Sequence, residues 1–380
     1  MFQFTEDQLG IQELVKDYSQ NAIKPLADEI DKTGRFPKEN IEGLKEIGVL
    51  QMTIPEEFGG TGMDDEITKC LAVMEVAKAC ASTAEILDVH YLSTDILMRK
   101  GTDEQKAMYL PQAADGKLGG FALTEPGAGS DAGGMKTRAV KDGSDYILNG
   151  TKCFISNLGP EEGNHFVCVA VTEPGIGSKG TTAFMVDRSM PGVSCGKTED
   201  KMGIRGAAVS ELVLEDVRVP ETAILGKLGE GFKIAMMGLD GGRIGIASQA
   251  CGVAFGAIEE AVKYSGERIQ FGRPINANQG IQWYLADMAT TAEAAWLLTL
   301  KAASLRQQGL PCTTEAAMAK WKAAEAACYC CDLALQIHGG YGYMKDYAIE
   351  RMYRDARILR IYEGTSEVQK MVIARNVIKG

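Results

Sequence analysis

Histidine is scarce in this sequence, with three residues in a chain of 380. Cys328 and Cys331 have the spacing of a metal-binding CxxC pair, but no second pair of this kind follows them. Because imidazole is scarce and the thiol pair is isolated, we expect no zinc site and no iron–sulfur site. The ten cysteines are scattered along the chain, which favours reduced, largely buried thiols in a cytoplasmic protein.

Excess positive charge and long apolar runs are also missing. The net charge is -11, and a broad nucleic-acid surface needs a cationic face, so we expect no nucleic-acid partner. No apolar run approaches the roughly 20 residues of a membrane span, so we expect no membrane-spanning helix. The first residues lack a basic segment followed by an apolar core, and we therefore expect no secretory signal.

The chain is long and has three zones of different pattern. At 380 residues it exceeds the usual size of a single domain. Apolar residues recur at helical spacing in residues 1–119, where Thr5 is a candidate N-cap. Residues 120–228 hold short β-branched stretches separated by glycine and proline, and helical spacing returns in residues 229–380. We expect an α+β multidomain fold with an N-terminal helical bundle, a central antiparallel β domain and a C-terminal four-helix bundle.

Two glycine-rich segments are candidate anion sites. Gly127–Gly134 lacks the GxGxxG spacing and the βαβ surroundings of a dinucleotide fold, so it is either a phosphate-binding loop or a surface turn. The segment Asp240–Arg243 is expected to open a helix. An arginine beside unpaired N–H groups suits an anionic ligand there, although an ordinary helix-start ion pair fits the same pattern.

Near the C-terminus a carboxylate is followed directly by a glycine, at Glu363 and Gly364. Glycine lets the backbone adopt positive φ and removes side-chain bulk beside the carboxylate. By itself the pair predicts either a helix-end turn or a carboxylate presented to a ligand.

Ordered motifs along nearly the whole chain are more specific than any one of these features. They are Leu123–Asp131, Gly150–Asn157, Lys201–Arg205, Asp240–Arg243, Arg268–Gly272, Gln336–Gly340 and Tyr362–Thr365. In this order they resemble the acyl-CoA dehydrogenase family, and in particular short-chain, butyryl-CoA dehydrogenase-like bacterial members. Family members are flavoenzymes with a helix–sheet–helix order, which agrees with the pattern described above.

The resemblance implies an FAD held between the β domain and the C-terminal bundle. Positions that match flavin contacts within one subunit are Phe121, Leu123, Thr124, Gly129, Ser130, Phe154, Ser156, Thr365 and Glu367. Positions that match contacts to a neighbouring subunit's FAD are Arg268, Gln270, Phe271, Gln279, Gln336, Gly339 and Gly340. The resemblance therefore implies an oligomer, a dimer at least and usually a homotetramer.

Glu363 matches the family's catalytic base. The family pattern implies that this carboxylate removes the α-proton of a CoA thioester while the β-hydrogen leaves as hydride to flavin N5. Substrate positions that match are Ser130, Asp240, Arg243, Tyr362 and Gly364. The reduced flavin then passes electrons to an electron-transfer flavoprotein.

Other activities remain open within this resemblance. Run backwards, the same site is an enoyl-CoA reductase of an anaerobe that works with an electron-transfer flavoprotein. An oxidase would pass the electrons to oxygen, and a non-catalytic flavin- or CoA-binding scaffold belongs to another class of protein.

Asp88 departs from what a fatty-acyl pocket favours. It lies on the helix that, by resemblance, floors that pocket, where a hydrocarbon tail prefers an apolar or small residue. One interpretation is an aspartate paired with a neighbouring polar side chain. The other is that Asp88 binds a polar, aryl or cyclic acyl group, or acts as an auxiliary base.

Overall fold

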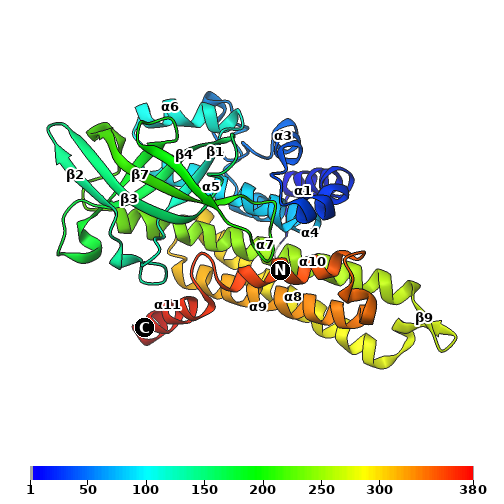
Figure 1. Ribbon diagram of the computed structural model, residues 1–380. Helices are drawn as coiled ribbons and strands as arrows, with labels where there is room; N and C mark the ends of the chain where they lie inside the picture. Colours follow the sequence, from blue (N-terminus) through cyan, green and yellow to red (C-terminus); the bar gives the residue numbers. More distant parts are fainter. Residues whose placement is uncertain (1–2, 380) are drawn as a thin grey trace.

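The computed structural model describes residues 3–379 and shows helices, then a β-sheet, then helices (Figure 1). The N-terminal stretch considered above for a secretory signal includes Met1 and Phe2, which lie outside the described residues. The helix–sheet–helix order predicted from the sequence is confirmed. Thr5 caps the first helix, because its hydroxyl accepts from the N–H of Gln8 while the Gln8 side chain accepts from the N–H of Thr5. The first group of α-helices comprises α1 (Glu6–Tyr18), α2 (Ala27–Thr33), α3 (Lys38–Glu46), α4 (Glu66–Ala79), α5 (Ala81–Lys100) and α6 (Asp103–Ala114).

The middle of the chain forms one twisted sheet whose strand order is β6-β7-β3-β2-β4-β5-β8, with β1 paired to β4. Its strands are β1 (Leu118–Ala122), β2 (Arg138–Asp142), β3 (Asp145–Ser156), β4 (Gly163–Val171), β5 (Thr181–Asp187), β6 (Val193–Thr198), β7 (Val209–Pro220) and β8 (Ile224–Leu225). Most pairs are antiparallel as expected, but β4 pairs in parallel with β1 and with one residue of β2. Parallel pairing occurs there because long connections, not tight hairpins, join β4 to these two strands.

The last third is a bundle of long helices, α7 (Gly231–Glu267), α8 (Gln279–Gln307) and α9 (Thr313–His338), followed by α10 (Ala348–Ala356) and α11 (Ser366–Lys379). The hairpin of β9 (Ile269–Gln270) and β10 (Arg273–Pro274) joins α7 to α8 at the end remote from the sheet (Figure 1). In contrast to the sequence-based expectation, Asp240–Arg243 does not open a helix, because α7 already begins at Gly231. Any anion binding there cannot use a helix N-terminus.

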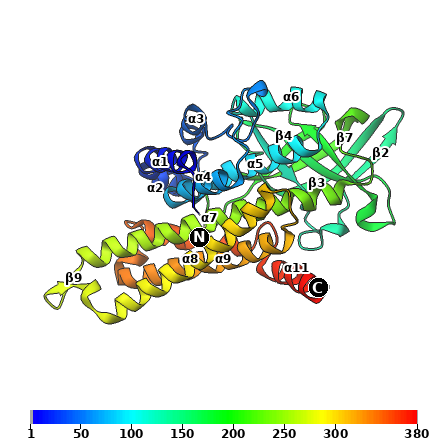
Figure 2. The same ribbon diagram turned by 180° about the vertical axis from the view of Figure 1, so that it is seen from behind.

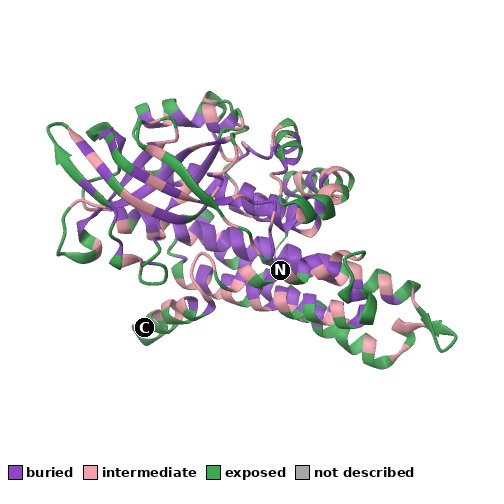
Figure 3. Ribbon diagram, viewed as in Figure 1, coloured by how far each residue is buried: buried purple, intermediate pink, exposed green. Residues whose placement is uncertain are grey.

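Small residues let the helices of the bundle approach closely. The alanines along α7 and α9 are buried, and the middle of α7 is buried on all sides (Figure 3). A Cβ at Gly252 of α7 would lie 2.3 Å from the Met74 carbonyl oxygen of α4. Because α5 contacts both β1 and α7, it lies where the sheet and the bundle meet (Figure 2).

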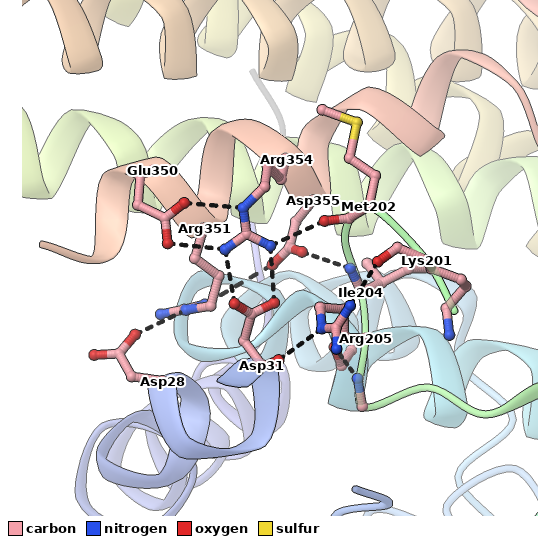
Figure 4. Close-up of polar contacts among 12 residues, drawn as sticks. Asp28, Asp31, Lys201, Met202, Ile204, Arg205, Glu350, Arg351, Arg354 and Asp355 are labelled. Carbon is pink, nitrogen blue, oxygen red and sulfur yellow. Dashed lines mark hydrogen bonds and ion pairs between the residues drawn. The ribbon is translucent and has the colours of Figure 1, made fainter. Parts of the chain in front are cut away.

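An ion-pair cluster joins α10 to the N-terminal helices (Figure 4). Arg354 of α10 pairs with Asp31 of α2 at 2.7 Å and with Glu350 at 2.8 Å, and it donates to the Met202 carbonyl. Asp355 accepts from the Ile204 N–H. These contacts hold the loop after β6 against α10. Within residues 3–379, no helix is long and apolar enough to cross a bilayer.

Candidate active site

The turn at Glu363–Gly364 lies between a short 3₁₀ segment, Arg357–Arg360, and α11. Glu363 has φ 50° and Gly364 has φ 96°, so the turn uses left-handed backbone at two successive positions. Such a conformation in a glutamate costs about 1–3 kcal/mol and persists when neighbours fix it. The neighbours are the buried Lys320 of α9, whose Nζ donates to the Gly364 carbonyl at 2.7 Å, and Gln369, which donates to the Glu363 carbonyl at 3.1 Å.

The Glu363 carboxyl group rests on a glycine of α7. A Cβ at Gly242 would lie 2.4 Å from Glu363 Oε2, closer than any real side chain tolerates. Three residues further on, a Cβ at Gly245 would lie 1.8 Å from Asp88 Oδ1. Since positions three apart share a helix face, α7 supplies two adjacent gaps that two carboxyl groups fill.

A third carboxyl group belongs to the same cluster. Glu85 and Asp88 are three residues apart on α5, and both are buried. Glu85 Oε1 accepts from Ser156 Oγ of β3 at 3.2 Å. Glu85 Oε2, Asp88 Oδ2 and Glu363 Oε2 are buried, and none has a hydrogen-bond partner among the described residues. Buried polar atoms are normally satisfied, so this unsatisfied group of oxygens indicates a site that a ligand completes.

Burial raises the pKa of all three carboxyl groups, and the charge of neighbouring carboxylates adds to the shift at Glu363 and Asp88. Burial, then the nearby charge of Glu85, raises the pKa of Glu363 to about 8, while Lys320 and Arg243 oppose the shift. Burial raises the pKa of Glu85 to about 7. Burial, then the charge of Glu363, raises the pKa of Asp88 well above its usual range. Three adjacent buried carboxylates cannot all ionise near pH 7, so the cluster contains exchangeable protons.

Tyr362 fixes the outer side of the turn. Its hydroxyl donates to Gln249 Oε1 of α7, and Gln249 in turn donates to the Ala81 carbonyl at 2.9 Å. The hydroxyl is thereby tied to both α7 and the start of α5. This contact helps to keep Glu363 facing inward.

Asp240 and Arg243 lie on α7 next to this cluster. Arg243 Nη1 lies 3.0 Å from Asp240 Oδ1, and Thr313 Oγ1 donates to Asp240 Oδ2 at 2.6 Å. Arg243 is mostly buried, and its Nε has no hydrogen-bond partner within the part of the chain that the structure describes. An arginine with a free donor one turn from the acid cluster suits an anionic or carbonyl-bearing ligand.

The β-domain residues predicted to contact a flavin lie on neighbouring strand ends. The Cys153 N–H donates to the Thr124 carbonyl at 2.9 Å, which places the segment after β1 beside β3. Lys152, fully buried, donates to the Leu123 carbonyl and pairs with Glu125 at 2.8 Å. The structure therefore brings together Phe121, Leu123, Thr124, Phe154 and Ser156.

These residues fit an isoalloxazine ring. Phe154 has φ 59° and is 64% exposed, so its backbone turns an aromatic ring out of β3. Gly129 and Ser130 lie in an exposed loop, and a Cβ at Gly129 would meet no atom within 4 Å among the described residues. An outward aromatic face, the Ser156 hydroxyl nearby and an open glycine loop suit a flat ring with a phosphate tail.

The residues predicted to reach a neighbouring subunit's FAD lie away from this cluster, near the β9–β10 hairpin (Figure 1). Phe271 is 99% exposed with φ 52°, and Arg268 stacks on the Tyr341 ring at 5.3 Å. Exposed residues of this group are Gln270, Gln279, Gln336, Gly339 and Gly340. Within one chain these residues therefore lie far from Glu363. They could contact a flavin only in a neighbouring subunit, which is the role predicted for them.

Thr365 and Glu367 lie at the start of α11. Thr365 Oγ1 accepts from the Val368 N–H at 3.3 Å. Glu367 is exposed in the first turn, and hydrogen bonds there lower its pKa. Within one chain, both residues therefore stabilise the N-terminus of α11.

Several site residues were missed from the sequence. Glu85 carried a usable signal, its i, i+3 spacing to Asp88 on an apolar helix. Gly242 and Gly245 carried none, because the carboxyl groups that fill their gaps come from distant parts of the chain. Lys320 was hidden in an alanine-rich helix.

Comparison with known proteins gives a consistent result. Residues 5–117, 120–217 and 229–378 match the N-terminal, middle and C-terminal domains of acyl-CoA dehydrogenase. The chain is 52% identical over 381 residues to the acryloyl-CoA reductase (NADH) of Anaerotignum propionicum, covering all of this chain and 96% of that one. Its structure matches butyryl-CoA dehydrogenase of Megasphaera elsdenii with TM-score 0.96 and 42% identity, over 100% of both chains. It also matches a chain from work on the electron transferring flavoprotein of Acidaminococcus fermentans, with TM-score 0.97 and 43% identity over 100% of both chains.

Proposed function

This chain belongs to the acyl-CoA dehydrogenase family of FAD-dependent oxidoreductases, and we propose that Glu363 is the base that removes the α-proton of its CoA thioester. The observation that carries this role is the buried, unsatisfied Oε2 of Glu363 against Gly242. A carboxyl group with a raised pKa is a stronger base once ionised, and burial provides that shift.

The neighbouring groups of this chain prepare the α-proton for removal. The α-proton beside a thioester is weakly acidic until hydrogen bonds stabilise charge on the carbonyl oxygen. Lys320 and Gln369 hold the left-handed turn at Glu363, so the direction of the Glu363 N–H is fixed, and this N–H is the proposed donor to the carbonyl oxygen. Arg243 and Asp240 hold the CoA end, and Ser130 lies where the pantetheine passes. FAD, when bound, accepts the hydride from the β carbon.

The flavin is held by the β-domain face of one subunit and by the hairpin end of another. Phe154 and Ser156 would contact the ring, and the loop at Gly129 and Ser130 would hold the phosphates. The exposed Phe271 and its neighbours complete the site of a second subunit, which makes the protein a homo-oligomer, in our proposal a tetramer. An electron-transfer flavoprotein is the proposed redox partner, consistent with the match to a chain from work on such a protein.

The reverse reaction, reduction of an enoyl-CoA, is a second candidate that one observation favours. With a pKa of about 8, Glu363 is mostly protonated at pH 7 and is ready to donate a proton to the α carbon. The 52% identity to an acryloyl-CoA reductase agrees with this direction. Dehydrogenation and enoyl-CoA reduction use the same residues. The redox potential of the partner flavoprotein therefore decides which direction prevails.

The acyl group is proposed to be short, aryl or cyclic. On the α5–α7 side the remaining cavity beside Asp88 measures about 10 Å³ and is lined partly by Lys69, Tyr91 and Asp95. A long hydrocarbon tail would have to displace charged groups there, at a cost of several kcal/mol. Asp88 thus borders the acyl group and limits its length.

The test is a panel of CoA thioesters mixed anaerobically with the purified holoenzyme while flavin absorbance is followed. Saturated short-chain thioesters should bleach the flavin, whereas long-chain thioesters should not. In the reverse assay, enoyl-CoA with NADH and a flavoprotein partner should be reduced. Release of hydrogen peroxide would instead indicate an oxidase, and a purified protein without FAD would contradict the proposal.

A further inference from the structure

Two cavities lie in series between the protein surface and the carboxyl cluster. The outer one measures about 420 Å³ and is lined by exposed residues such as Glu56 and Asp64, so it reaches solvent. The inner one measures about 10 Å³, which is about the space of one water molecule. Lys69, Tyr91 and Asp95 line both cavities.

The inner cavity reaches the site itself. Its lining includes Asp88 and also Gly242, the glycine on which the Glu363 carboxyl group rests. Asp88 is 2% exposed, and its Oδ2 has no hydrogen-bond partner in residues 3–379. Glu363 and Asp88 thus lie side by side against α7, and the inner cavity connects Asp88 with Asp95.

The outer part of this series is held rigidly. Lys69 Nζ lies 2.6 Å from Glu66 Oε2, and Arg306 Nε lies 2.8 Å from Glu66 Oε1. Asp95 pairs with Arg306 at 2.5 Å and with Arg99 at 2.7 Å. These pairs fix the Asp95 carboxylate at the boundary of the two cavities, a position from which it can accept hydrogen bonds from water.

We propose that Asp88, the inner cavity and Asp95 form a proton path that connects Glu363 with solvent. The inference rests on the proposed role of Glu363. A bound thioester fills the open side of Glu363. The α-proton that Glu363 has taken therefore needs a second route out of the site.

The proton steps balance without any further reactant. After α-proton removal, Asp88 releases its own proton to water in the inner cavity, which passes it along Asp95 to the outer cavity. The O–H bond on Glu363 then breaks, and a new O–H bond forms on the ionised Asp88. In enoyl-CoA reduction the same steps run inward and reprotonate Glu363.

The charges that face Asp88 suit a transient proton carrier. Glu85 lies on the same helix, Glu66 and Lys69 face it from α4, and Glu363 faces it from the turn before α11. Tyr362 is also within electrostatic reach. Burial and these carboxylates favour the protonated form of Asp88, and Lys69 opposes them, so Asp88 holds a proton that it can pass to the inner cavity before it takes one from Glu363.

The test follows a labelled proton in the holoenzyme. Butyryl-CoA carrying deuterium on its α carbon is mixed anaerobically with wild type, Asp88→Asn, Asp95→Asn and the control Glu75→Gln. Glu75 is a buried α4 glutamate that also has an unpartnered oxygen among the described residues but lines neither cavity. Flavin bleaching gives the rate of reduction, and mass spectrometry of the recovered thioester gives the rate of deuterium loss to solvent.

In wild type and Glu75→Gln, deuterium loss should keep pace with flavin reduction. In Asp88→Asn and Asp95→Asn the ratio of deuterium loss to flavin reduction should fall at least tenfold, because the label stays on Glu363 and returns to the α carbon. A ratio within twofold of wild type in either variant overturns the proton path while leaving the role of Glu363 standing. If butyryl-CoA does not bleach wild-type flavin, the labelled thioester is the short, aryl or cyclic one that does. If no such thioester bleaches it, the proposed function fails, and the path falls with it.

Discussion

Glu363 packs its carboxyl group against Gly242, where a Cβ would lie 2.4 Å from Oε2. The helix that carries the glycine and the turn that carries the glutamate are more than a hundred residues apart in the chain. The space that Gly242 leaves on α7 therefore positions the Glu363 carboxyl group as much as the turn that carries Glu363 does.

Gly242→Ala should displace the Glu363 carboxyl group and lower kcat at least tenfold. The added methyl group cannot be accommodated without moving the carboxylate or the strained turn that carries it. Flavin bleaching by a short acyl-CoA measures the effect. The matched control is Gly10→Ala in α1, where a Cβ meets no atom within 4 Å among residues 3–379. This substitution should stabilise the helix by about 0.5–1 kcal/mol. Equal activity in both variants would contradict the packing argument.

Glu85→Gln should lower the pKa that controls α-proton removal. The Glu85 charge is, after burial, the main cause that raises the pKa of Glu363, so its removal shifts that pKa down from about 8. In wild type, dehydrogenation should rise with pH through about 8, because the base must be ionised, whereas enoyl-CoA reduction should fall. The pH profile of kcat/KM measures the shift, and Glu75→Gln serves as the control. An unshifted profile in Glu85→Gln would argue against this coupling.

The same raised pKa values predict how stability depends on pH. Glu363 and Glu85 are protonated in the folded protein at pH values where they ionise in the unfolded chain. Their contribution to stability is fully present below the unfolded pKa of about 4.5 and declines as pH rises toward about 7–8. Urea unfolding at pH 6 and pH 8.5 should show a loss in wild type that is smaller in Glu85→Gln. No difference between the two proteins would be inconsistent with the buried acid cluster.

Lys152→Met should destabilise the protein by about 3–5 kcal/mol, because it leaves the Glu125 carboxylate buried and without its cation. Loss of the Lys152 contact to the Leu123 carbonyl should also loosen the flavin face and reduce the FAD retained on purification. The exposed pair Lys141–Glu221 provides the comparison, and Lys141→Met should cost no more than about 1 kcal/mol. Thermal unfolding followed by circular dichroism measures the stability of both variants. Similar losses of stability in Lys152→Met and Lys141→Met would refute the structural importance of the buried Lys152–Glu125 pair.

Phe271→Ser should weaken the oligomer and reduce bound FAD together. A phenylalanine that is 99% exposed at the β9–β10 hairpin suits a subunit interface. Val140→Ser, an exposed site on β2, should change neither property. Light scattering gives the mass, and the flavin-to-protein absorbance ratio gives the FAD content. A Phe271→Ser protein of unchanged mass and FAD content would rule out the hairpin as a shared flavin site.

The sequence was sufficient for the order of helices and strands because its periodicity and its motifs agree. Helical spacing in residues 1–119 predicted a helical region, which α4 and α5 confirm, and the predicted N-cap Thr5 forms a capping box. The expected helix start at Asp240 was wrong, because two adjacent glycines resemble a helix end. In the structure they lie inside α7, where Arg306 and Glu363 occupy the space that their side chains would fill.

The site was predictable only in part, for a physical reason. Glu363 and Asp88 stand out through residue type and neighbours in the chain. The environment that raises both pKa values is burial together with the charge of Glu85, and it forms where α5, the glycines of α7 and the Glu363 turn meet across long sequence separations. Periodicity reports which residues are buried, but not which buried groups face one another.

The most direct measurement of the central claim compares Glu363→Gln with wild type in anaerobic single turnover. The amide retains the size of the side chain but cannot take the α-proton. The variant should keep FAD and bind CoA thioesters, while the rate of flavin bleaching by a saturated short acyl-CoA falls by at least a thousandfold. Bleaching at a rate near that of wild type, with FAD and ligand binding intact, would show that Glu363 is not the base.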